Sequence, residues 1–217
     1  MTYLIIFLIA VAAYLLGSIP GGYLLTKLVR NEDIRDHGSK STGATNATRL
    51  LGWKLGLVAA LIDVLKGIVV IAILEIFQLT EFYLIGSVNI LPFYGIIAVL
   101  GHVFSIYLKF RGGKAVATSF GVVTYFTPPI AIIGIIIFVL IIHFTKYVSL
   151  GSMITAAFLF IVATVVHLIE PSLVSLEEVI TYFILVVIII LRHIPNIKRL
   201  SNNEELKFKI KKQEWLL

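Results

Sequence analysis

Apolar residues run along this 217-residue chain in long stretches that are separated by short polar segments. A hydrocarbon core about 30 Å thick requires roughly 20 apolar residues in helical form. Four stretches reach that length and three are shorter, so the pattern predicts an all-α membrane protein with seven transmembrane helices, some of them short or tilted. The predicted spans are 3–25, 56–77, 84–107, 115–127, 129–144, 148–168 and 179–194.

The positions of the basic residues predict how these spans are oriented. Every lysine and arginine except Lys66 falls on one side of a seven-span arrangement, in segments 26–55, 108–114, 145–147 and 192–217. Cytoplasmic loops carry an excess of such residues, which predicts that the N-terminus lies outside and the C-terminus in the cytoplasm. If 115–127 did not cross, the basic tail 195–217 would lie outside. A signal peptide at the N-terminus is disfavoured, because no basic region precedes the first stretch and further spans follow.

Composition agrees with a single polytopic domain over residues 1–217. Hydrophobic residues make up 59% of the chain and charged residues 14%, whereas soluble domains have about 45–50% and 25%. The absence of cysteine excludes disulfides and thiolate metal sites. The net charge of +6 indicates a charge bias between loops or anionic ligands rather than nucleic acid. We expect the lysine-rich tail from Lys207 to Trp215 to lie on the anionic inner leaflet.

The first basic loop contains a run of small and hydroxyl residues. Residues 38–46 read Gly-Ser-Lys-Ser-Thr-Gly-Ala-Thr-Asn, and Arg49 follows. Small residues allow backbone N–H groups to converge on an anion, and the planar arginine fork suits phosphate. Gly38 and Gly43 have the spacing of a nucleotide P-loop, but Ala44 stands where that motif needs lysine and no strand precedes it. A nucleoside triphosphatase is therefore disfavoured, and a simple polar turn is the alternative to an anion site.

Three other basic segments carry polar residues that suit an anion. Residues 112–114, Gly-Gly-Lys, come before a predicted helix, whose free N–H groups favour an anion, although a flexible basic turn would look the same. Ser149 starts another helix and is either a cap or a ligand. The third segment, 192–199, contains His193 and Asn196. Because all of these segments share one face of the membrane, we expect one cytosolic pocket to contain Ser39, Arg49, Lys114, His193 and Asn196.

Two charged residues lie in the middle of the second predicted span, away from Glu75 near its outer end. Asp63 and Lys66 are three residues apart and therefore share a helical face. We interpret them as a structural ion pair that borders the site, in preference to a proton relay. His102 and Gly101 in the third span are also interpreted as structural, with Gly101 allowing close helix packing.

Together these motifs resemble the bacterial integral-membrane glycerol-3-phosphate acyltransferases that use acyl-phosphate as donor. This chain departs from the family pattern at two places. The family usually has Gly-Asn where this chain has Lys40-Ser41, and a basic residue where this chain has Ile194, just before Pro195. The resemblance rests on Gly-Ser-Ile-Pro-Gly-Gly-Tyr at 17–23, the run 38–46 with Arg49, Gly-His-Val-Phe at 101–104 leading into Lys-Phe-Arg-Gly-Gly-Lys at 109–114, and Tyr-Val-Ser-Leu at 147–150.

The resemblance implies acyl transfer from acyl-phosphate to glycerol-3-phosphate, which gives 1-acyl-glycerol-3-phosphate (lysophosphatidic acid) and phosphate in the first step of phospholipid synthesis. It implies a site that faces the cytoplasm from the bacterial cytoplasmic membrane, with the two substrates and membrane lipids as partners and with no cofactor, metal or nucleic acid. The catalytic residues it implies are Ser39, Arg49, Lys114 and His193, and the substrate-binding residues are Gly38, Thr45, Asn46, Gly112, Gly113, Ser149 and Asn196.

Two alternatives stay open at the level of sequence. No histidine is followed five residues later by aspartate, the dyad expected of acyltransferases that use acyl-CoA. The base that takes the glycerol hydroxyl proton is therefore either a phosphate oxygen of a substrate or His193. The alternative function is a membrane transporter of an organic phosphate with an inward-facing basic pocket, although its outward path would lack cations.

Overall fold

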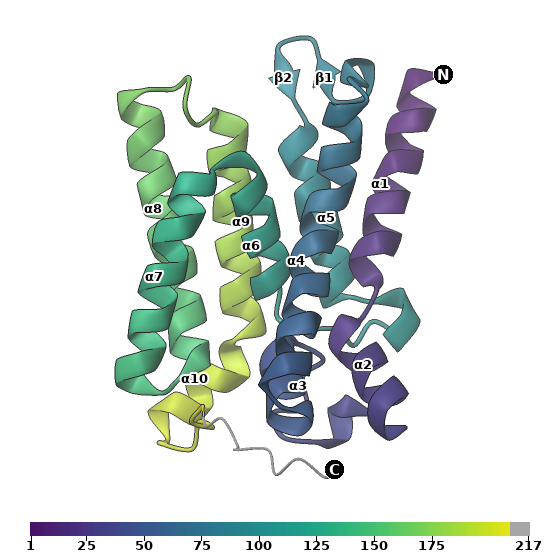
Figure 1. Cartoon of the computed structure of the whole chain (residues 1–217). Coiled ribbons are helices and arrows are strands. Elements are labelled where there is room, and N and C mark those ends of the chain that lie inside the picture. Colours follow the sequence, from purple (N-terminus) through teal and green to yellow (C-terminus); the bar gives the residue numbers. More distant parts are fainter. Residues whose placement is uncertain (209–217) are drawn as a thin grey trace.

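A computed structural model describes residues 1–208 of the chain, and these residues form a bundle of helices (Figure 1). The membrane-like helices run roughly along one direction, and shorter helices cover one end of the bundle. The α-helices are α1 (Thr2–Ser18), α2 (Gly21–Arg30), α3 (Ala44–Leu51), α4 (Trp53–Ile76), α5 (Leu91–Val103), α6 (Val116–Phe126), α7 (Pro128–Thr145), α8 (Val148–Ile169), α9 (Leu176–Arg192) and α10 (Ile194–Ser201). Short elements are η1 (Ile34–Asp36), η2 (Thr80–Phe82), η3 (Ile106–Leu108), β1 (Leu84–Ile85) and β2 (Val88–Asn89).

The prediction of an all-α membrane protein is confirmed, whereas the number of seven spans stays a prediction. Among the described residues, four helical stretches are long and apolar enough to cross a membrane: α4, Leu91–Leu108, α7 and α8. The pairs α1–α2 and α9–α10 bend by 41° and 54° and raise the number to six if each pair is one span. The eleven residues of α6 extend only about 16 Å, too little to cross a bilayer unaided.

Several predicted boundaries were wrong, each for a local reason. The first helix ends at Ser18, because Pro20 has no N–H to continue the hydrogen-bond ladder. Residues 84–90 do not begin a helix but contain the hairpin β1–β2, with Gly86 at φ 61°. The last long helix begins earlier than predicted, where Ser175 and Glu178 form a reciprocal capping box. Residues 209–217 of the predicted basic tail lie outside the described residues.

Helix α5 is the most enclosed of these stretches. Its membrane-like window is 61% buried, against 17% for α7 and 22% for α8. Helix α1 approaches it closely, since a Cβ added at Gly17 would lie 2.0 Å from the carbonyl oxygen of Ala98, and one at Gly101 would lie 2.2 Å from that of Tyr14. The predicted role of Gly101 in close packing is confirmed. The outward faces of α7 and α8 are apolar, which suits contact with lipid.

A buried polar cluster joins α4 to α5. Lys66 Nζ lies 2.8 Å from Asp63 Oδ1 and also donates to the carbonyl oxygen of Ile19 at 2.8 Å. His102 Nδ1 lies 3.6 Å from the same Asp63 oxygen. The predicted ion pair is confirmed, and the cluster also involves His102 and the backbone at the bend after α1.

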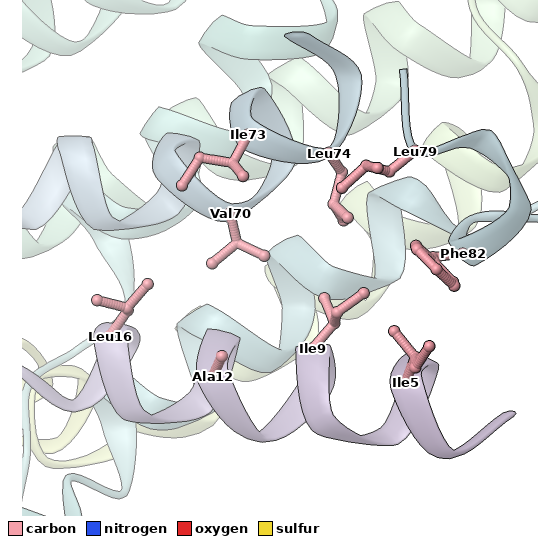
Figure 2. A pocket seen from close by; sticks show the side chains of 9 residues that line it. All are labelled: Ile5, Ile9, Ala12, Leu16, Val70, Ile73, Leu74, Leu79 and Phe82. Atoms are coloured by element: carbon pink, nitrogen blue, oxygen red, sulfur yellow. The ribbon is translucent and has the colours of Figure 1, made fainter. Parts of the chain in front are cut away.

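The ends of the bundle differ in chemistry. The N-terminus and the hairpin lie at one end, and α2, α3 and α10 lie at the other (Figure 1). A cavity of about 300 Å³ opens between α1 and α4 and is lined only by hydrocarbon side chains, among them Ile9, Leu74 and Phe82 (Figure 2). Such a lining offers nothing to an anion, so polar chemistry has to be sought at the end that carries α3 and α10.

Candidate active site

Asn46 holds the first basic loop in shape. Its carboxamide is 1% exposed, with Nδ2 donating to the carbonyl oxygens of Ile34, His37 and Ser41 at 3.0–3.1 Å and Oδ1 accepting from the Ser39 N–H at 3.0 Å. These contacts use both amide hydrogens. In this structure Asn46 positions the loop, and its predicted role as a donor to substrate stays a prediction.

Two residues of the same loop have left-handed backbones. Gly38 has φ 54°, and a Cβ there would lie 2.4 Å from Asn46 Oδ1, so only glycine fits. Lys40 has φ 55° without being glycine. This conformation favours glycine, which gives a physical reason for the glycine expected at position 40 from the family resemblance. Thr45 lies half-buried in the first turn of α3.

The second basic loop, which contains Gly112 and Gly113, is fixed by hydrogen bonds to α5 and α9. The N–H groups of Gly112 and Gly113 donate to the carbonyl oxygens of Val103 and His102 at 3.1 and 3.0 Å. Arg192 donates to the carbonyl oxygens of both glycines, at 3.1 Å to Gly113 and 3.4 Å to Gly112. Both glycine N–H groups are therefore bonded to the backbone of the same chain, and the substrate-binding role of Gly112 and Gly113 stays a prediction. The two glycines also give the backbone a tight path, since a Cβ on Gly113 would lie 2.1 Å from His102 Nε2.

The third and fourth segments place polar side chains beside the same end of the bundle. Ser149 lies in the first turn of α8 and is 4% exposed. The N-cap residue of α8 is Tyr147 rather than Ser149. His193 and Asn196 are each 2% exposed and lie at the bend between α9 and α10. His193 Nδ1 lies 2.8 Å from the carbonyl oxygen of Ile189, which can only accept, so Nδ1 carries a hydrogen and Nε2 holds the lone pair of the neutral ring.

Basic residues from different loops lie close to one another at this end of the bundle. Burial, together with the nearby cations Arg199, Arg49 and Arg192, lowers the pKa of Lys114 to about 8, although Glu205 acts in the opposite direction. Burial also lowers the pKa of Arg49, whose Nη2 donates to the carbonyl oxygen of Leu206 at 3.1 Å. The cations are close enough to destabilise one another, which is a property of sites that bind anions.

The described residues bring part of the predicted set to one end of the bundle, although only Ser39 of the five lines the cavity there. A cavity of about 280 Å³ lies between the first loop and the segment after α10, lined by Gly38, Ser39 and Lys40 on one side and by Arg199, Glu204 and Leu206 on the other. Arg49 and Lys114 interact electrostatically with Glu205, which accepts hydrogen bonds from Ser149 and Asn196.

Three residues of the cluster were not predicted from the sequence. Arg192 and Arg199 are not among the predicted site residues, although their positions on either side of His193 and Asn196 mark them as near the site. Glu205 was merged into a basic tail, and its acidic character between Asn203 and Lys207 was the available signal. Arg199 Nε lies 2.8 Å from Glu205 Oε2.

Comparisons with known proteins agree with this arrangement. Residues 7–203 match the model of the glycerol-3-phosphate acyltransferase family. The chain is 42% identical to a glycerol-3-phosphate acyltransferase of Fusobacterium nucleatum, covering 94% of this chain and 98% of that one. It is 41% identical to one of Bacillus subtilis, with 95% and 99% covered.

Two solved structures are also similar. Crystal structures of PlsY (YgiH), an integral membrane glycerol 3-phosphate acyltransferase, superpose with TM-scores of 0.82 for the glycerol 3-phosphate form and 0.80 for the lysophosphatidic acid form. They are 33% and 32% identical in sequence, and each comparison covers 94% of this chain, with 96% and 95% of the other. The fold and the site define a polytopic helical membrane protein with a cluster of cationic and polar side chains at one end. The chain belongs to the glycerol-3-phosphate acyltransferase family.

Proposed function

We propose that this protein transfers a fatty acyl group from acyl-phosphate to glycerol-3-phosphate, releasing 1-acyl-glycerol-3-phosphate and phosphate. The observation that carries the proposal is the convergence of Arg49, Lys114, Ser149 and Asn196 at one end of an apolar bundle. Both substrates carry phosphate, which cations and hydroxyl groups bind. The acyl chain is hydrocarbon and can approach through the lipid. The relatives named above are acyltransferases of glycerol-3-phosphate, which supports the choice of acceptor.

The chemistry needs little from the protein beyond position and charge. The glycerol hydroxyl oxygen attacks the acyl carbonyl carbon, the bond from that carbon to the phosphate oxygen breaks, and phosphate leaves. We assign Arg49 and Lys114 to the phosphate groups, where they stabilise the charge that develops on the leaving group. Ser39 is assigned to the carbonyl or phosphate oxygens, and Ser149 with Asn196 to the acceptor.

A substrate phosphate oxygen is proposed as the base that takes the hydroxyl proton, so that the proton departs with inorganic phosphate or stays on the acceptor phosphate. His193 is the alternative base. Its Nδ1 is held by the carbonyl oxygen of Ile189, which leaves Nε2 as the nitrogen able to accept a proton.

We further propose that the site faces the cytoplasm of a bacterial cell, from the cytoplasmic membrane, with seven crossings and an external N-terminus. The cation asymmetry of the loops supports this orientation. The short helix α6 packs against α4, α5, α7 and α9, so protein shields it on several sides. Protection of this kind allows a helix shorter than the bilayer to occupy membrane depth.

The donor can be tested with purified protein, labelled glycerol-3-phosphate and either acyl-phosphate or acyl-CoA. We expect lipid product with acyl-phosphate and none with acyl-CoA. Product from acyl-CoA alone would contradict the proposed donor. Movement of glycerol-3-phosphate across vesicles without lipid product would instead support a transporter, which no comparison supports.

The lowered pKa of Lys114 predicts how activity depends on pH. The ammonium form binds phosphate, so kcat/KM for glycerol-3-phosphate should fall as pH rises through about 8 in the wild type. The second pKa of a phosphate monoester is about 6, so the acceptor does not titrate in this range. Lys114→Arg keeps its charge and should shift the fall to higher pH by about two units or more. Identical basic limbs in the two proteins would contradict the assignment.

A further inference from the structure

The carboxylate of Glu205 accepts hydrogen bonds from two residues that are assigned above to the acceptor, Ser149 and Asn196. Its side chain is 6% exposed. Oε1 accepts hydrogen bonds from Ser149 Oγ at 2.8 Å and from Asn196 Nδ2 at 2.6 Å, and Oε2 accepts one from Arg199 Nε at 2.8 Å. The donors come from α8 and α10, and two of them are residues predicted to bind substrate.

The backbone on either side of Glu205 is also attached to the site. The carbonyl oxygen of Leu206 accepts from Arg49 Nη2 at 3.1 Å, and the N–H of Phe208 donates to the carbonyl oxygen of Lys146 at 2.7 Å. The segment 204–208 therefore extends across the cationic end, from the end of α10 towards the loop before α8. The position of Glu205 is held by contacts on three sides.

Charge explains why an acidic residue is stable there. Burial opposes its ionisation, yet hydrogen bonds from Asn196, Ser149 and Arg199 outweigh burial and keep the pKa of Glu205 below its usual value. Lys114 and Arg49 lie within electrostatic reach of the same carboxylate. Without an anion, these cations would repel one another in a partly buried site.

We propose that Glu205 is an internal competitor for the acceptor phosphate, which occupies the anion site of the free protein and leaves when glycerol-3-phosphate binds. This inference rests on the proposed function, because it takes the Ser149–Asn196 region as the acceptor site. A carboxylate has two oxygens and one charge, whereas a phosphate dianion has more oxygens and reaches more of the cations. Because a tethered group acts at an effective concentration of about millimolar, weak monoanions cannot displace it. Glu205 thereby determines specificity for a phosphorylated acceptor.

The test compares Glu205→Gln and Glu205→Ala with the wild type. Removing the competing charge should lower KM for glycerol-3-phosphate by about tenfold, since hydrogen bonds to charged groups are among the strong ones. The value of kcat should stay within about twofold, as expected when only ground-state competition is removed. A variant Glu81→Gln makes the same charge change at an exposed residue of η2, at the other end of the bundle, and should leave KM nearly unchanged. An equal fall in KM in Glu81→Gln, or an unchanged or higher KM in both Glu205 variants, would overturn the proposal.

Thermal unfolding with inorganic phosphate tests occupancy without any turnover. In the wild type, phosphate has to displace Glu205, so the Tm increase at a given phosphate concentration should be small. In Glu205→Gln the free protein should have a lower Tm, and the increase should be larger. An equal increase in both proteins would overturn the proposal. Absence of acyl-phosphate turnover in an otherwise phosphate-binding wild type would instead refute the proposed function, so the two failures are distinguishable.

Discussion

Alanine at Arg49 or Lys114 is expected to reduce acyl-phosphate-dependent turnover by about 100- to 1000-fold, which is the effect of removing one donor to a developing charge. Both cations lie at the end of the bundle where Ser149 and Asn196 gather. Their loss should leave the fold intact, because neither side chain belongs to the core. Initial rates of lipid product, normalised to the amount of protein in the membrane, measure the effect.

Conservative variants and a nearby control separate charge from geometry. Lys114→Arg keeps a cation and should recover a large part of the activity at neutral pH. Arg49→Lys should recover less, because a lysine cannot make the paired hydrogen bonds of a guanidinium. Lys198→Ala removes an exposed cation of α10 outside the cluster and should change the rate by less than about twofold, as screened surface charges contribute little. Near-normal turnover in both Arg49→Ala and Lys114→Ala would refute the proposed roles.

The largest effect on stability is expected from Asp63→Asn. Asp63 is 1% exposed and lies 2.8 Å from Lys66 and 3.6 Å from His102. Removing its charge leaves the lysine buried without its partner, which costs about 3 to 5 kcal/mol. Unfolding by heat or denaturing detergent should occur much earlier in this variant, and activity should fall because His102 supports the backbone of Gly113.

A double replacement provides the control for this prediction. Asp63→Leu with Lys66→Met removes both charges and keeps similar volumes, so no isolated charge is left. We expect the double variant to be more stable than Asp63→Asn, since replacing a complete buried pair by apolar residues is often neutral. A double variant less stable than the single one would show that the pair itself, rather than the isolated lysine, determines the loss.

The general location of the site could be predicted because it depends on simple patterns. Cations confined to alternate loops indicate one face of the membrane, and small residues around Ser39 and Lys114 indicate an anion. The boundaries were less predictable. Leu84, Ile85 and Val88 are as apolar as any helix residue, so hydropathy alone did not reveal the hairpin, although Gly86 and Ser87 between them form a turn signal.

Individual hydrogen bonds could not be predicted in this way. The spacing around Asn46 and Gly113 shows that polar groups are present, but not whether they face a ligand or another part of the backbone. In the fold, Asn46 binds three carbonyl oxygens of its own loop, and Gly113 donates to the carbonyl oxygen of His102. The contact of Glu205 with Ser149 joins residues 56 positions apart, which no local pattern reports.

The contact between Arg49 and Leu206 connects residues that are 157 positions apart in the chain. The ribosome therefore makes one side of this cluster early and the other only when synthesis is nearly finished. A chain that stalls before α9 and α10 have been made carries Arg49 and Lys114 without Asn196, Arg199 and Glu205, so the cluster forms only after the segment that follows α10 has been made.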